Sequence, residues 1–209
     1  MSGQSTTLIH ALPLDVAVAF RDAFLSGAVP AAVLNDDPIG LSASSRNNFN
    51  ETSLRALIRS AGVAGLGHLE RLADFPTDKP EGIEIPPVDH AFVLSGAELQ
   101  IAADGVRALQ SALSADVDIV RRAIPCLADM DDAALAHEID ASPDKRHRQL
   151  DEMNRKGRGA EFPVRPHRYS LMGSDGALYE TTLFLVAYLD VLEAAMAQGL
   201  AVVLVCWLY

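Results

Sequence analysis

The chain has 209 residues, of which 49% are hydrophobic and 22% are charged, and its formal net charge at pH 7 is −11. This length and composition fit one well-packed domain. The acidity argues against a nucleic-acid-binding protein, because a negative field repels phosphate groups.

The first predicted elements are a strand and a helix. The apolar and β-branched residues of 6–12 favour a strand. Asp15 is expected to cap a helix that continues to about Ser26. Residues 30–50 are rich in Pro, Gly, Ser, Asn and Asp, and they predict one long loop.

Two helices and a proline-rich connection are predicted next. Asn50 is expected to cap a helix over 51–61, and a short helix is expected over 67–74. Residues 74–90 contain four prolines, so they predict a connection. We nevertheless expect a single domain over 1–209.

The middle of the chain predicts a capped amphipathic helix. Ser95 and Glu98 have the spacing of a capping box, and apolar residues follow at helical spacing to about Leu113. Gly105 inside this helix costs about 1 kcal/mol relative to Ala, or permits close packing. A further helix is expected over 116–124, ended by a proline.

The last third predicts helices of different character. A short Asp-capped helix is expected over 129–140, and a charged helix over 142–157 within a charged surface segment, 142–170. The longest helix is expected over 175–198. Residues 201–208 are uninterruptedly apolar, which is typical of a central strand covered on both faces.

These elements predict an α+β fold that is mainly helical. Several helices would pack on a small sheet that contains the N-terminal and C-terminal strands as neighbours. Residues 83–85 and 90–94 are candidates for additional strands.

The cysteines and the apolar C-terminus indicate the cellular compartment of the protein and its relation to membranes. Cys126 and Cys206 are too few for a disulfide framework, and each lies among apolar neighbours, so two buried, reduced thiols are expected. Residues 199–209 fall short of the roughly 20 residues that span a bilayer as a helix. The N-terminus lacks the pattern of a secretory signal. We expect a cytoplasmic protein without membrane contact.

No local motif assigns a metal or a catalytic residue. His137, Glu138 and His147 lack the spacing of a zinc-protease helix, which needs two His four residues apart. Carboxylates at 129, 131 and 132 could hold Mg²⁺ or Ca²⁺, but the rest of a calcium loop is missing, and helix capping explains them more simply. The sequence contains no G-x-S-x-G elbow. No cofactor is expected.

Glycines at 62, 65 and 67 invert the spacing of a dinucleotide fingerprint and follow a helix rather than a strand. Phosphate binding by such a loop needs a strand before it. We therefore interpret these glycines as a break between two short helices.

Residues 144–168 hold eight of the seventeen Lys and Arg residues and four of the twenty-eight acidic residues. The rest of the chain thus keeps nine basic (17 − 8) and twenty-four acidic (28 − 4) residues. Salt screens charges over about 8 Å, so a local basic patch only partly escapes the negative field of the rest of the chain. This basic segment is interpreted as a surface that pairs with the chain's acidic helices or with a partner, or as a solvated mobile segment. Nucleic acid is not an expected partner.

The C-terminal residues 178–207, LYETTLFLVAYLDVLEAAMAQGLAVVLVCW, resemble the helix-then-strand endings of small bacterial immunity proteins and of YfbM-like proteins. An L-S-x-x-E helix start, here Leu94, Ser95 and Glu98, also resembles YfbM-like chains. The resemblance covers about a third of the chain. It implies toxin neutralisation and supplies no functional residues.

We expect an acidic binding protein that covers or neutralises a protein partner, a basic one, because an acidic face speeds association with it. The oligomeric state stays open. The predicted partner-binding residues are Asp129, Asp131, Asp132, Arg146, Arg148, Arg155 and Arg158.

Two alternatives remain. One is an enzyme without a local motif, a hydrolase or a transferase, that uses His137, Glu138, His147 or His167 near the basic segment; a deep pocket that collects several of them would favour it. The other is an architectural subunit of a larger assembly, which an exposed apolar patch would favour.

Overall fold

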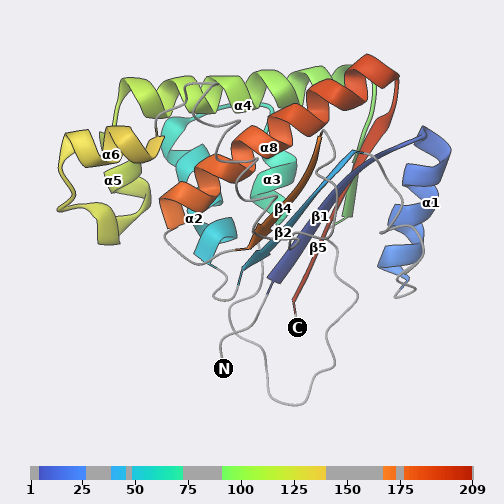
Figure 1. Cartoon of the computed structure of the whole chain (residues 1–209), viewed down its shortest axis with the longest axis horizontal. Helices are drawn as coiled ribbons and strands as arrows, with labels where there is room; N and C mark the ends of the chain where they lie inside the picture. Colours follow the sequence, from blue (N-terminus) through green and yellow to red (C-terminus); the bar gives the residue numbers. More distant parts are fainter. Residues whose placement is uncertain are drawn as a thin grey trace, which may run out of the picture.

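A five-stranded sheet forms the centre of the protein (Figure 1). The structure is a computed structural model, and it describes residues 5–26, 39–45, 49–72, 91–139, 167–172 and 177–208. The strand order is β3-β5-β1-β2-β4. The strands are β1 (Ser5–Leu12), β2 (Gly40–Ser45), β3 (Ala91–Leu94), β4 (Arg168–Met172) and β5 (Ala201–Leu208).

The N-terminal and C-terminal strands pair directly, as the sequence predicts. β1 and β5 are antiparallel, from Ser5 opposite Leu208 to Leu12 opposite Ala201. β3 pairs with the other edge of β5. Val202 to Cys206 have no exposed surface because β5 lies between two strands and is covered on both faces. The prediction of a central apolar strand is confirmed.

Two strands, β2 and β4, were not predicted. β2 lies inside residues 30–50, which we expected to be one loop; it pairs antiparallel with β1 and parallel with β4. Its sequence, GLSASS, has little β propensity of its own. The strand therefore owes its conformation to ladder hydrogen bonds with its two neighbours, which no local pattern reveals.

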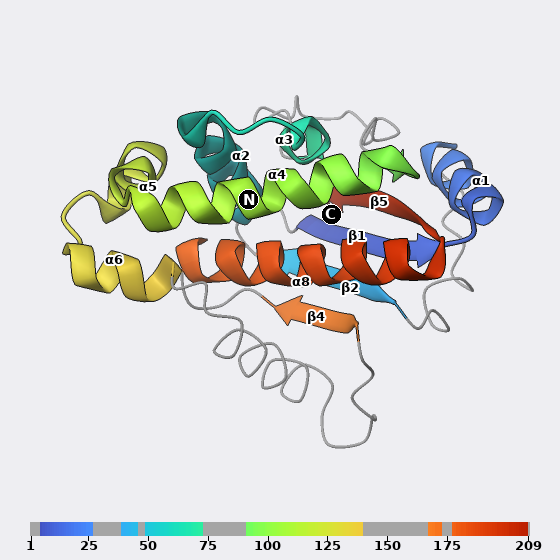
Figure 2. The same ribbon diagram turned by 90° about the horizontal axis from the view of Figure 1, so that it is seen from above.

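Seven α-helices and one short 3₁₀ helix complete the described fold (Figure 2). The helices are α1 (Leu14–Leu25), α2 (Phe49–Ala61), α3 (Gly67–Leu72), α4 (Ala97–Ala115), α5 (Asp118–Ala123), η1 (Pro125–Leu127), α6 (Asp132–Ile139) and α8 (Ala177–Gln198). The α+β fold class is confirmed.

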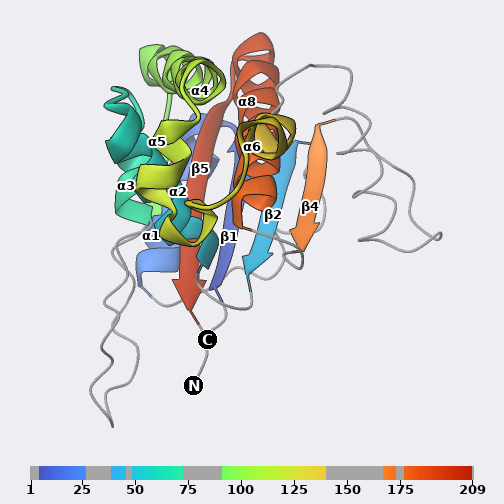
Figure 3. The same cartoon turned by 90° about the vertical axis from the view of Figure 1, so that its left-hand side faces the viewer.

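α8 is the helix at the centre of the larger core. It runs beside α4 over one face of the sheet (Figures 2 and 3), and Tyr188, Val191 and Leu192 are fully buried. The stretch Thr181–Gln198 is long and apolar enough to cross a membrane by those two criteria alone, and 56% of it is buried inside the protein. Burial against the sheet and α4 accounts for its apolar character.

α1 covers the opposite face of the sheet and forms a second, smaller core. Phe20 and Phe24 pack with Leu8 of β1 and with Val203 and Val205 of β5. Alternate residues of β5 thus serve the two cores, since Leu204 belongs to the larger one. The period-2 alternation of a strand places β5 in both clusters.

Glycines permit a close approach between α4 and the connection from α2 to α3. A Cβ on Gly105 would lie 2.8 Å from the Ala64 carbonyl oxygen, and one on Gly65 would lie 2.7 Å from the Ile101 carbonyl oxygen. Gly62 and Gly65 have φ of 64° and 86°. The predicted helix break at these glycines is confirmed.

Several predicted helix ends are close to the observed ones, and their caps differ in detail. Glu98 reaches back to the Ser95 backbone N–H at 3.1 Å, which is half of the predicted capping box, but Gly96 occupies the N-cap position. Asp15 and Asn50 lie inside the first turns of α1 and α2, so they are not the predicted N-caps.

Three other predictions fall outside the described residues. They are the connection over 74–90, the strand over 83–85 and the charged helix over 142–157. One thiol prediction is wrong. Cys206 is buried, but Cys126 is exposed, because Pro125 opens the 3₁₀ turn η1, none of whose residues is buried.

Candidate functional sites

The acidic end of the protein, defined as residues 116–139, comprises α5, η1 and α6 (Figure 3). It carries six acidic residues and two arginines, a net charge of −4 (2 − 6) with histidine neutral. Arg121 holds its two halves together, with Nη1 2.7 Å from Asp118 Oδ1 and Nη2 2.8 Å from the Met130 carbonyl oxygen. The same guanidinium also pairs with Asp132, and these carboxylates raise the pKa of Arg121.

The predicted acidic contact residues all lie exposed at this end but have different local roles. Asp131 Oδ1 accepts a hydrogen bond from the Ala134 backbone N–H at 2.9 Å, so it caps α6. Asp132 is paired with Arg121. Asp129 forms no ion pair within the part of the chain that the structure describes. Asp129 and Asp131 therefore present charge that no described cation neutralises.

The predicted basic contact residues, Arg146, Arg148, Arg155 and Arg158, lie outside the described residues, as does His147. Of the other residues named for the enzyme alternative, His137 and Glu138 are on α6, and His167 precedes β4. The Glu138 backbone carbonyl accepts a hydrogen bond from Thr182, whereas His167 contacts Asp190. Thr182 and Asp190 are eight residues apart on α8, which corresponds to about 12 Å at 1.5 Å per residue. The α6 residues and His167 therefore contact different parts of α8 and do not share one site.

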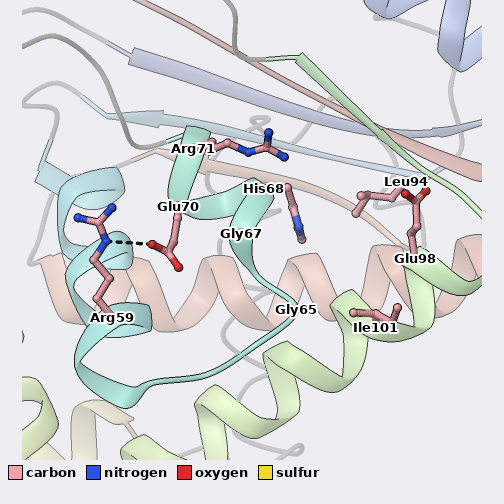
Figure 4. A pocket seen from close by; sticks show the side chains of 9 residues that line it. All are labelled: Arg59, Gly65, Gly67, His68, Glu70, Arg71, Leu94, Glu98 and Ile101. Atoms are coloured by element: carbon pink, nitrogen blue, oxygen red, sulfur yellow. Dashed lines mark hydrogen bonds and ion pairs between the residues drawn. The ribbon is translucent and has the colours of Figure 1, made fainter.

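A pocket of about 490 Å³ lies where α2, α3 and α4 meet (Figure 4). None of the four residues of the enzyme alternative lines it. It is lined instead by the residues Arg59, Gly65, Gly67, His68, Glu70, Arg71, Leu94, Glu98 and Ile101. At Gly65 and Gly67 the pocket wall is backbone without a side chain.

His68 is the most deeply buried ionisable group of this pocket. Its Nε2 is 2.7 Å from the Tyr188 hydroxyl, and burial, aided by the charge of Arg71, lowers its pKa to about 4. Tyr188 is fully buried, and burial raises its pKa. Among the described residues His68 is the only hydrogen-bond partner of the Tyr188 hydroxyl. A buried hydroxyl left without an acceptor is costly, so Tyr188 donates to Nε2 and the neutral imidazole carries its proton on Nδ1.

The charges around the pocket are divided between paired and unpaired groups. Arg59 Nε donates to Glu70 Oε2 at 2.9 Å. The Arg71 guanidinium lies 4.6 Å from the centre of the Phe92 ring, a cation–π contact, and it forms no ion pair with a described residue. The Nδ1–H of His68 and the Arg71 guanidinium are thus donors at the pocket, whose wall also carries the Glu98 carboxylate.

A third cluster joins β4 to α8. His167 Nδ1 and the Tyr169 hydroxyl lie 2.7 Å and 2.6 Å from the same oxygen, Oδ2 of Asp190. The side chain of Asp190 is 19% exposed and that of His167 is 42% exposed. His167 adopts φ of 56°, the left-handed region, and its carbonyl oxygen accepts the Gly40 N–H at 2.9 Å.

Sequence reasoning named His167 but missed its partners. The signal for Asp190 is its position inside the apolar run LFLVAYLDVLEAAM, where a carboxylate needs a polar partner. The pocket around His68 left no comparable signal, because its walls come from three helices. Among the described residues, no three His, Cys, Asp or Glu side chains are grouped to hold a metal ion.

Comparisons of the chain with protein-family models, with curated proteins and with solved structures find no match.

Proposed function

We propose that this chain is a cytoplasmic binding protein whose acidic end contacts and covers a basic protein partner. The observation that carries the proposal is the unneutralised charge of Asp129 and Asp131, both exposed at one end of the molecule. The cytoplasmic location is part of this proposal, and the small number of cysteines in the sequence supports it.

A rigid acidic surface favours fast and selective association. Arg121 joins α5 to the start of α6 and Asp131 caps α6, so the carboxylates of Asp118, Asp131 and Asp132 are held in place before binding. Complementary charge steers a basic partner toward such a surface, and the gain is reduced as salt screens the charges. The resemblance of the C-terminal residues to immunity proteins makes a basic toxin the first partner to test.

The proposal is tested with a double variant, Asp129→Asn with Asp131→Asn. Asparagine is as good an N-cap as aspartate, so α6 keeps its cap while two negative charges disappear. The matched control is Asp15→Asn with Asp22→Asn, which removes two exposed charges from α1 on the opposite face of the sheet. The tagged proteins are used to isolate partners from a lysate of the source cell, at low and at moderate salt, with nuclease treatment in parallel.

We expect a stoichiometric basic protein with the wild type and with the control. Its recovery should fall as salt rises, should be indifferent to nuclease and should be lost with the Asp129/Asp131 variant. Equal recovery with both variants would place the contact elsewhere and refute the proposed surface. Recovery that collapses on nuclease treatment would mean that a nucleic acid, not the acidic end, makes the contact.

A further inference from the structure

His167 stands in the left-handed backbone region, which is uncommon for residues with a side chain, although histidine enters it more often than most. Its φ of 56° lies in the left-handed region, where a residue with a side chain costs about 1–3 kcal/mol and glycine is favoured. The strain is held by the Gly40 N–H, which binds the His167 carbonyl, and by the contact of the ring with Asp190. These two contacts fix where the imidazole lies relative to Asp190.

The hydrogen bonds define which ring nitrogen carries the proton. Asp190 Oδ2 accepts the Tyr169 hydroxyl hydrogen at 2.6 Å. The same oxygen lies 2.7 Å from His167 Nδ1, and two lone pairs at that distance would repel one another. Nδ1 therefore donates its hydrogen to the carboxylate, and in the neutral ring Nε2 carries the lone pair.

Nε2 is the ring nitrogen that Asp190 does not engage, and the ring is partly exposed. The side chain of His167 is 42% exposed while that of Asp190 is only 19% exposed. Nδ1 is engaged by Asp190, and Nε2 has no hydrogen-bond partner in the described part of the chain. A carboxylate that orients an imidazole through Nδ1 and leaves Nε2 free is the arrangement that general-base histidines use.

We propose that His167 is the general base of a catalytic site beside β4, with Asp190 and Tyr169 as positioning residues. The inference goes beyond partner binding and does not depend on the acidic end. In the reaction, Nε2 takes a proton from water as the water oxygen bonds to the carbonyl carbon of an ester. The bond from that carbon to the leaving oxygen then breaks, and the proton passes from Nε2 to the leaving group. The substrate class is thus one that water or a hydroxyl group attacks, and the imidazole is regenerated.

The first test uses p-nitrophenyl acetate as the probe and measures release of p-nitrophenolate at pH 8. The wild type is compared with His167→Gln, and His137→Gln is the matched control because His137 is exposed on α6. We expect at least a fivefold loss of rate with His167→Gln and none with the control. A loss smaller than fivefold would overturn the proposal.

Two further variants separate catalysis from a structural contact. Asp190→Asn keeps the shape of the side chain and removes the charge that fixes the imidazole, so the rate should fall at least fivefold without a change in the far-ultraviolet circular dichroism. Tyr169→Phe should lower the rate less, because His167 keeps its bond to Asp190. Retention of the full rate by Asp190→Asn would refute its positioning role.

A measurement on the wild type alone avoids any dependence on variant folding. Brief treatment with diethyl pyrocarbonate, followed by peptide mass spectrometry, reports the reactivity of each imidazole. We expect His167 to be modified faster than His137, since its side chain is partly exposed and Asp190 holds its ring in one orientation. Modification of His167 at the rate of His137 or more slowly would contradict the proposal.

Discussion

Burial of the His68 imidazole next to Tyr188 links the stability of the fold to pH. The pKa of His68 is lowered from 6.5 to about 4, first by burial and then by the charge of Arg71. Between these pH values the unfolded chain binds a proton at this position and the folded chain does not. Acidification therefore favours the unfolded state, and the contribution of neutral His68 is lost as pH falls from 6.5 to about 4.

We accordingly predict that the free energy of unfolding falls with pH in this window, by about 3 kcal/mol from His68 at 1.36 kcal/mol per pKa unit. Urea titrations of the wild type and of His68→Gln check it, since glutamine still offers Tyr188 an acceptor but does not titrate. As pH falls, the wild type should lose stability relative to His68→Gln. A difference that stays constant from pH 7 to pH 4 would contradict the prediction.

Single residues differ in how far the sequence reveals their role. Asp131 caps α6 as predicted, because an aspartate before an apolar helical pattern is a local signal. The role of His167 needs Asp190, which is 23 residues away in sequence, and that of His68 needs Tyr188, which is 120 residues away. Contacts across such separations depend on tertiary packing, so no local pattern could predict them.

At the scale of elements, α4 and the connection before α3 depend on glycine. Alanine usually stabilises a helix interior by about 1 kcal/mol relative to glycine. At Gly105 its methyl group would lie 2.8 Å from the Ala64 carbonyl oxygen and 3.0 Å from Leu66. The connection would have to move away from α4, and the contact of Leu66 with the core would loosen.

We predict that Gly105→Ala destabilises the protein by about 1–3 kcal/mol, the usual cost of overpacking a core. The matched control is Gly67→Ala, where a Cβ would meet no atom within 4 Å; its effect should be close to zero or slightly stabilising. Equilibrium urea unfolding measures both. A stabilising effect of Gly105→Ala would mean that the helix propensity outweighs the close contact.

How well each helix or strand could be predicted depends on the strength of its local sequence pattern. α4 and α8 have long helical spacing of apolar residues, and β5 is apolar throughout, so the sequence predicts all three. β2 lacks such a pattern, and the polar–apolar alternation of β4 is short; these strands form because β1 offers an edge to β2, which in turn offers a parallel edge to β4. Pairing of this kind is a property of the assembled sheet.

At the scale of the whole molecule, β5 belongs to two cores at once. Leu204 and Cys206 pack under α8, whereas Val203 and Val205 pack under α1. β5 also pairs with β1 along its whole length, from Ala201 to Leu208. A loss of either core would therefore expose one face of the strand that supports the other core.

This shared strand predicts that the protein unfolds in a single transition, as expected of one domain over 1–209. Phe20→Ala, in the smaller core, should destabilise the whole molecule by about 3–5 kcal/mol. Far-ultraviolet circular dichroism reports the helices, and fluorescence of Trp207, the single tryptophan, reports β5. The two urea transitions should coincide in the wild type and shift together in the variant. Helical signal lost before the Trp207 transition would mean that α1 and its core unfold separately, and that β5 does not couple the two faces of the sheet.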